Sequence, residues 1–226
     1  MTLKENDSDT SRRKLIDAFA ELSTSNISDA ADRFRVRSGC RGIKPVVQGT
    51  KIAGTAFTVK YVPASVRPGT VGDYIDSARR GDVIVIDNNG RTDCTVWGDL
   101  LTLRAKTMGI SGTVIDGVCR DVSSIEAIGY PVFSRGCFMV TGKDRVQLDE
   151  VNVPISVSGV RVQPGDIVVA DDSGVVIVPS DLAQEILTAA REVARAEELI
   201  EGEIRKGTTL SEARRKAGYH SLQRKT

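Results

Sequence analysis

Residues 97–121 read WGDLLTLRAKTMGISGTVIDGVCRD, and this stretch decides the fold class. Leu100, Leu103 and Met108 have the spacing of residues on one helix. The run Thr113–Ile115 is rich in β-branched residues, as is typical of a buried strand. The stretch therefore predicts a helix followed by a short strand, the repeating unit of α/β proteins.

A charged pair follows this strand. We expect Gly117 to supply the turn that ends the strand, which leaves Arg120 and Asp121 at its carboxyl end. Ligands bind at this edge in open α/β sheets, so the pair is a candidate site. The alternative is an ion pair on the protein surface.

Two further stretches repeat the order of helix and strand. Residues 71–90 contain a short helix and the apolar run Val83–Ile86, and residues 123–136 contain a helix and a strand at Pro131–Phe133. Alternation of this kind predicts βαβ units and a largely parallel sheet. We therefore expect an α/β fold.

The flanking segments have other patterns. Residues 11–22 have one apolar helical face, and residues 28–34 predict a short second helix with Ser28 as its cap. Residues 46–62 suit strands interrupted by a turn or bulge. Residues 140–179 show β-type runs and turns, which predict a β-rich layer against the α/β part.

A long helix is predicted at the C-terminal end, with Ser180 or Asp181 as its cap. Charged residues outnumber apolar ones at 191–206. We therefore expect this helix to lie in solvent or to pack against a neighbouring subunit.

Length and composition restrict the class of protein. The 226 residues, 40% of them hydrophobic, predict one domain over 1–226, with an α/β core at 28–180 and a helical extension at 181–226. Since 31 Lys and Arg face 30 Asp and Glu, nucleic acid is not expected as a partner. Residues 1–13 are polar and no window approaches a membrane span, which predicts a cytoplasmic protein with no membrane partner.

Metal and nucleophile chemistry are restricted by the cysteines and the single histidine. The chain has four scattered cysteines, which we interpret as structural: Cys40, Cys94, Cys119 and Cys137. A nucleophilic Cys119 would need a base, and the only histidine, His220, lies in the far tail. Unless His220 folds back, Ser-His-Asp catalysis and a histidine-rich zinc centre are excluded. A metal would then have oxygen ligands, which favours Mg²⁺ or Mn²⁺.

A second candidate element lies at the start of the helix in the opening stretch. Gly98 and Asp99 precede backbone N–H groups that lack intrahelical partners and can hold a carboxylate or phosphate. The alternative is that Asp99 and Asp121 cap their helices and Arg120 is a solvated charge. If adjacent parallel strands precede both turns, these side chains converge on one edge, where a small anionic substrate and a metal would fit.

These motifs together resemble a known family, that of the regulator of ribonuclease E activity A and of 4-hydroxy-4-methyl-2-oxoglutarate aldolase. The resemblance spans about residues 29–205 and rests on four runs in order: GDVIVIDNNG, WGDLLTLRAKTMGISGTVIDGVCRD, YPVFSRG and VQPGDIVVADDSGVVIVP. It implies a compact three-layer β/β/α swivelling-domain fold. It also implies a homotrimer or a higher assembly of trimers.

The resemblance assigns roles to individual residues. Arg120 matches the arginine that binds the oxo-acid end of the substrate, and Asp121 matches the aspartate that holds Mg²⁺ or Mn²⁺. Glu197 matches a glutamate from the C-terminal helix of the next subunit that helps to position water, with Glu198 as the nearby alternative. Four residues match the element that surrounds the substrate: Gly98, Asp99, Leu100 and Leu101.

The implied reaction is metal-dependent cleavage of a C–C bond beside a small 2-oxo acid to give pyruvate. It is a retro-aldol cleavage, an oxaloacetate decarboxylation, or both. Arg120, Asp99 and Glu197 are the expected catalytic residues. A water that is bound to the metal or held by Asp99, and is also oriented by Glu197, would take up the hydroxyl proton. Lys143 is a further candidate, for binding a distal carboxylate or as a solvated loop residue.

The same residues bear on other classes of function. A Schiff-base aldolase needs a buried lysine, and no motif demands one at Lys60, Lys106 or Lys143. A methyltransferase is not supported, because no glycine-rich nucleotide loop follows the first strand. The rival is a non-catalytic protein that binds and inhibits an RNA-processing enzyme such as ribonuclease E.

Overall fold

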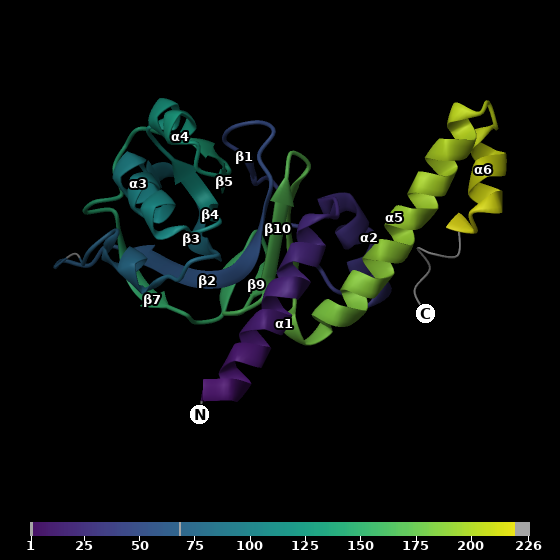
Figure 1. Ribbon diagram of the computed structural model, residues 1–226. Helices are drawn as coiled ribbons and strands as arrows, with labels where there is room; N and C mark the ends of the chain where they lie inside the picture. Colours follow the sequence, from purple (N-terminus) through teal and green to yellow (C-terminus); the bar gives the residue numbers. More distant parts are fainter. Residues whose placement is uncertain (1, 68, 220–226) are drawn as a thin grey trace. The chain divides into compact units, whose positions relative to one another are not determined.

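The computed structural model describes residues 2–67 and 69–219, with side chains from residue 10 onward, so His220 lies outside the described residues. The chain divides into two compact units (Figure 1). The helical unit combines the described residues of Met1–Ser38 and Asp181–Thr226, and the sheet unit is Gly39–Ser180. None of the helices in the described part of the chain has both the length and the apolar character that a membrane crossing requires.

The helical unit confirms the two predicted N-terminal helices but not the predicted cap. The second helix begins at Thr24, because the Ser23 hydroxyl accepts a hydrogen bond from the Asn26 amide at 3.1 Å. Ser28 therefore lies inside this helix and caps nothing. The helices of this unit are α1 (Thr2–Ala20), α2 (Thr24–Arg33), α5 (Ala183–Arg205) and α6 (Leu210–Lys216).

The long helix α5 packs against helices of its own unit, which the excess of charged residues did not indicate. Ile186 and Val193 lie on one face at helical spacing and are fully buried, while the charged residues occupy the other faces. Neither of the two residues predicted to cap α5 does so. Ser180 and Asp181 belong to the 3₁₀ turn Ser180–Leu182, and α5 starts only after it.

One sheet of nine strands organises the sheet unit, and its central strands are parallel, as predicted. The strands β8 (Ile155–Val157) and β9 (Val160–Val162) form a separate hairpin. The nine strands of the sheet are β1 (Lys44–Pro45), β2 (Ile52–Pro63), β3 (Asp82–Thr95), β4 (Gly112–Cys119), β5 (Val132–Ser134), β6 (Gly136–Cys137), β7 (Val146–Val151), β10 (Ile167–Asp171) and β11 (Gly174–Val178). Their order is β1-β5-β4-β3-β2-β10-β11, with β6 beside β4 and β7 beside β2. The pairs β2–β3, β3–β4 and β4–β5 are parallel.

Helices cover one face of this sheet and a hairpin covers the other. The 3₁₀ helix η1 (Asp73–Ser77), α3 (Asp99–Met108) and α4 (Val122–Ile128) are the predicted helices, and they share one apolar core with Ile84 of β3. The β8–β9 hairpin packs on the opposite face, where Val157 is fully buried. The fold is thus mixed α/β, with hairpin, sheet and helices as three layers.

Residues 140–179 form a separate layer only in part. The strands β7 and β10 both pair antiparallel with β2, and β11 pairs with β10, so all three extend the main sheet. Only the β8–β9 hairpin stands apart from it. An alternating pattern identifies a strand and its buried face but not its neighbour, so the sequence could not assign these pairings.

Gly117 does not end its strand, because β4 continues to Cys119. A Cβ atom at Gly117 would lie 3.1 Å from the side-chain Nδ2 atom of Asn88 and 3.2 Å from the Arg91 carbonyl oxygen. Glycine is needed here because β3 approaches β4 closely, and the prediction of a turn at this residue is wrong.

Two aspartates of adjacent strands attach the hairpin to the sheet. Asp116 of β4 is 5% exposed, forms an ion pair with Arg135 and accepts a hydrogen bond from the Ser158 amide at 2.7 Å. Its register partner Asp87 accepts a hydrogen bond from the Ser156 amide at 3.3 Å. The two aspartates thereby fix the hairpin above adjacent parallel strands.

We predict that Asp116→Ala lowers the free energy of unfolding of the sheet unit by about 2–3 kcal/mol, because it leaves Arg135 and the Ser158 amide without their acceptor. Urea denaturation followed by the emission of Trp97, the single tryptophan, measures this. Asp93→Ala removes an exposed ion pair with Arg91 and serves as the control, with an unchanged midpoint. Equal midpoints for both variants would contradict the prediction.

Candidate functional site

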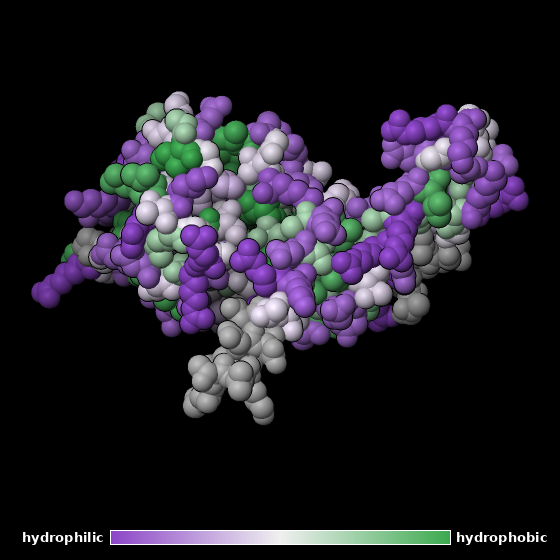
Figure 2. Space-filling view, viewed as in Figure 1, coloured by the Kyte–Doolittle hydropathy of each residue, from purple (hydrophilic) through white to green (hydrophobic). Residues whose placement is uncertain are grey.

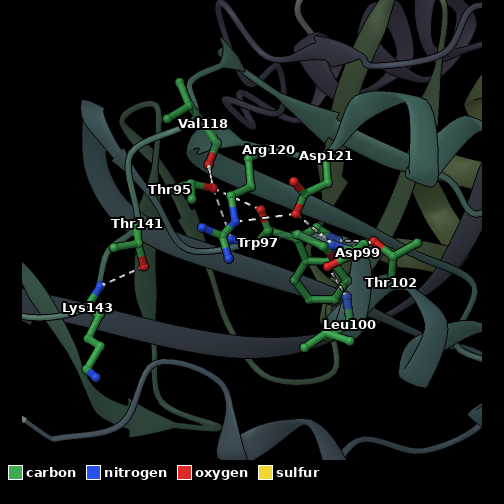
Figure 3. A network of polar contacts seen from close by, with 11 residues as sticks. Thr95, Trp97, Asp99, Leu100, Thr102, Val118, Arg120, Asp121, Thr141 and Lys143 are labelled. Carbon is green, nitrogen blue, oxygen red and sulfur yellow. Dashed lines mark hydrogen bonds and ion pairs between the residues drawn. The ribbon is translucent and has the colours of Figure 1, made fainter.

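Two turns meet at the carboxyl edge of β3 and β4 (Figure 3). The Arg120 amide donates a hydrogen bond to the Trp97 carbonyl oxygen at 3.0 Å. The Asp99 amide donates to the Asp121 carboxylate at 3.3 Å. The structure therefore brings Asp99, Arg120 and Asp121 together, as the parallel strands predicted, while their roles in catalysis stay predictions.

The Asp121 side chain turns away from its own helix. Asp121 has a left-handed backbone, with φ of 59°, and its carboxylate makes no capping bond to α4. It contacts the first amide of α3 instead, where a negative charge is stabilised by the helix dipole. Asp99 does not cap α3 either, since its carboxylate accepts only from the adjacent Leu100 amide at 2.8 Å. Simple capping therefore explains neither aspartate.

Arg120 lies against Asp121 rather than free in solvent. Its Nε atom is 3.3 Å from an Asp121 carboxylate oxygen, and its side chain is 41% exposed. A Cβ atom at Gly98 would lie 2.6 Å from that oxygen and 3.3 Å from the Arg120 Cγ atom. Gly98 is therefore the residue that lets the start of α3 approach both charged groups.

A buried hydroxyl ties the two strand ends together. The Thr95 hydroxyl lies 2.9 Å from the Trp97 carbonyl oxygen and 3.0 Å from the Val118 carbonyl oxygen, and it accepts from the Trp97 amide at 3.2 Å. Thr95 is at the end of β3 and Val118 near the end of β4. This one side chain thus fixes the turn that Arg120 contacts.

Trp97 is a supporting residue that sequence reasoning missed. Its indole N–H donates to the Thr102 hydroxyl at 2.8 Å, and that hydroxyl donates to the Gly98 carbonyl oxygen at 2.8 Å. The indole ring stacks on Tyr130 with centroids 6.1 Å apart. The signal in the sequence was a lone tryptophan directly before Gly98, since a buried indole needs a partner for its N–H group.

The remaining residues of the substrate-binding element differ in exposure. Leu101 packs against the core, whereas Leu100 is 79% exposed and Leu103 is also exposed, and Figure 2 shows hydrophobic surface over α3. Lys143 is exposed on a segment that is bridged to Thr95 through Thr141. It therefore projects from a loop beside the candidate site.

Glu197 lies on α5 in the helical unit and already has a partner there. Its carboxylate accepts a hydrogen bond from the Asn26 side chain at 2.5 Å, and it is half-buried. Glu198 is exposed and has no hydrogen bond or ion pair in the described part of the chain. A role for either glutamate in a neighbouring subunit stays a prediction.

The carboxylates of the site suit a hydrated Mg²⁺ or Mn²⁺ ion. Asp99 and Asp121 each keep one carboxylate oxygen without a partner among residues 10–67 and 69–219. The same residues contain no cluster of three or more His, Cys, Asp or Glu arranged to hold a metal. Magnesium commonly binds proteins through one or two carboxylates and keeps several waters, so this donor set fits it and does not fit a structural zinc ion.

Neither Lys60 nor Lys106 offers a Schiff-base nucleophile. A hydrogen bond and the charge of Asp149, 2.7 Å away, raise the pKa of Lys60, the opposite of the shift that such a nucleophile needs. Lys106 is exposed and donates to the Gly129 carbonyl oxygen at 2.9 Å. Arg120 and the carboxylates are therefore the groups of the candidate site that could take part in chemistry.

A family model described as "RraA-like: Aldolase/RraA" matches residues 24–177. The chain belongs to the RraA-like family. The matched range contains every predicted site residue except Glu197, so the family assignment covers the site edge but not the C-terminal helix.

RraA-like relatives of different names are similar to the chain. Protein DlpA of Legionella pneumophila is 44% identical over 94% of this chain, which spans only 35% of that protein. A protein of Halalkalibacterium halodurans named "Putative 4-hydroxy-4-methyl-2-oxoglutarate aldolase" is 37% identical over 78% of this chain and 81% of its own length. The structure of Streptomyces coelicolor RraAS2, titled an unusual member of the RNase ES inhibitor RraA protein family, is 29% identical, with a TM-score of 0.75 over 82% of this chain and 94% of that one.

We predict that Thr95→Val loosens the site, because it leaves the buried Trp97 amide without an acceptor at a cost of about 1–3 kcal/mol. The urea midpoint should fall and the Trp97 emission maximum should shift. Thr107→Val is the matched control, since its hydroxyl bonds only to its own helix on an exposed face. Identical behaviour of the two variants would show that Thr95 does not hold the turn.

Proposed function

We propose that the chain is a divalent-metal-dependent lyase that cleaves a C–C bond beside a 2-oxo acid and releases pyruvate. The observation that carries the proposal is the Arg120 guanidinium beside the Asp121 carboxylate at the N-terminus of α3. The aldolase name of the H. halodurans relative also supports it. The substrates that fit are 4-hydroxy-4-methyl-2-oxoglutarate and oxaloacetate.

The proposed site must stabilise an enolate. Retro-aldol cleavage or loss of CO₂ leaves the bond's electron pair on C3 of the pyruvyl half, and the pair delocalises onto the C2 oxygen. Arg120 would donate hydrogen bonds to that oxygen through its planar fork. Of the first-turn amides of α3, the Leu101 amide is not engaged by either aspartate and would hold the substrate carboxylate. Asp121 would hold a divalent cation, which supplies Lewis-acid stabilisation of the same oxygen.

Asp99 is the candidate for proton transfer. Its partner-free carboxylate oxygen would take the hydroxyl proton, directly or through a water, as the C–C bond breaks. The same proton, returned to C3 of the enolate, gives pyruvate and balances the reaction. Decarboxylation of oxaloacetate needs only the protonation of C3, and the proton then comes from solvent water.

The proposed lyase also includes a glutamate from α5 of a neighbouring subunit. Glu198 fits this role better than Glu197, because Asn26 already holds the Glu197 carboxylate within its own chain. A homotrimer of the kind that the family resemblance implies would bring such a helix to each site.

Conversion of oxaloacetate to pyruvate should require Mg²⁺ or Mn²⁺. Chelation should abolish turnover and either cation should restore it, because without a divalent cation the negative charge on the enolate oxygen loses its Lewis-acid stabilisation. Metal ions also decarboxylate oxaloacetate in solution, so the controls are each cation alone and each cation with Asp121→Ala protein. Full turnover by exhaustively chelated protein would refute metal dependence.

Arg120→Lys should lower kcat by at least about tenfold, or about 1.4 kcal/mol in the barrier, since the charge remains but the fork is lost. Arg104→Lys is the matched control, an exposed arginine of α3 paired with Asp76. An unchanged Trp97 emission confirms that the fold persists in both. Normal kcat in Arg120→Lys would make Arg120 only a surface charge.

The second candidate is a protein that binds and inhibits an RNA-processing enzyme, and the similarity to RraAS2 favours it. Such a protein needs no catalytic residues at the carboxyl edge of β3 and β4. Absence of pyruvate formation from either substrate, with metal present, would favour inhibition over catalysis.

A further inference from the structure

Two of the cysteines are direct neighbours in the sheet. Cys119, the last residue of β4, is the register partner of Cys137 in the parallel strand β6, and their sulfur atoms are 3.8 Å apart. Neighbouring strands lie about 4.8 Å apart, which is within the ~4.4–6.8 Å between Cα atoms of disulfides. The two thiols therefore lie where a disulfide bond requires only a small movement of the sulfur atoms.

The two thiols differ in their access to solvent. Cys137 is exposed, so it does not have the burial that is typical of a structural cysteine, and that interpretation stays a prediction for this residue. Cys119 is fully buried and lies next to it. An oxidant in solution therefore reaches Cys137 first and leaves Cys119 as the second partner. Cys40 and Cys94 are buried without a thiol neighbour among the described residues.

A bond between these sulfurs would act on the candidate site through the backbone. A disulfide bond is about 2.05 Å long, so the sulfur atoms must approach by roughly 1.8 Å. Cys119 is bonded directly to Arg120, whose amide holds the Trp97 carbonyl oxygen. Movement at Cys119 is therefore transmitted to the turn that carries Arg120 and Asp121.

We propose that Cys119 and Cys137 form a reversible disulfide on exposure to peroxide, and that this bond lowers the activity of the adjacent site. The first half stands on the thiol geometry alone, and the effect on activity rests on the proposed lyase function. Disulfides of this transient kind are the ones found in reducing compartments.

The oxidation balances with a hydroperoxide as oxidant. The Cys137 sulfur attacks hydrogen peroxide, the O–O bond breaks, and Cys137 becomes a sulfenic acid while one water leaves. The Cys119 sulfur then attacks the Cys137 sulfur, and the S–O bond breaks to release a second water. The two thiols lose two electrons, which reduce the peroxide, and a dithiol reductant reverses the bond.

Mass spectrometry tests the bond without reference to activity. After dilute peroxide, the intact chain should lose two hydrogen atoms and yield a linked peptide pair containing Cys119 and Cys137, which dithiothreitol separates. Cys137→Ser should abolish the link, and because this position is exposed the variant should fold. Cys94→Ala is the matched control and should form the link as the parent chain does.

Two further readouts test the effect on the site. Peroxide should shift Trp97 emission and lower pyruvate formation in the parent chain and in Cys94→Ala, and dithiothreitol should restore both. Cys137→Ser should resist the change. Over-oxidation of Cys137 without a link, or a link only between two chains, would overturn the disulfide. A link with unchanged Trp97 emission would overturn its effect on the site, even if the chain has no lyase activity.

Discussion

The parallel register of β3 and β4 is the constraint on which the candidate site depends. Parallel strands end at the same edge, and the hydrogen bond from the Arg120 amide to the Trp97 carbonyl oxygen continues that pairing beyond the strands. The Thr95 hydroxyl reinforces it from within the core. The charged side chains of the site are therefore held by backbone geometry, and their own ion pair contributes little, since exposed pairs are weak.

This arrangement explains how much the sequence could predict. The three helix–strand repeats are local patterns of helical and strand period, and parallel strands with adjacent ends follow from them. The convergence of Asp99, Arg120 and Asp121 was predicted on the condition that adjacent parallel strands precede both turns. The structure meets that condition, because β3 pairs with β4 and continues beyond the predicted strand to Thr95. The site edge was therefore accessible to reasoning from the sequence.

The features that were missed depend on contacts between distant segments. The sequence suggested a turn at Gly117. The actual reason for a glycine there is its close contact with Asn88 on the neighbouring strand β3, and this contact is visible only in the folded structure. From the sequence, the helix cap was placed at Ser28 and not at Ser23, because both serines precede helix-forming residues. Only the hydrogen bond from the Asn26 amide to the Ser23 hydroxyl identifies Ser23 as the cap. The register of Cys119 with Cys137 likewise appears only when β6 is placed beside β4.

The left-handed backbone of Asp121 restricts how this position can change as the family diverges. Asparagine and glycine adopt φ near 59° with little strain, whereas a β-branched residue there is disfavoured. A lineage that no longer needs the carboxylate can therefore lose it most easily through these two residues, with the fold retained. The backbone thus provides a route from a charged site to a neutral binding surface on the same scaffold.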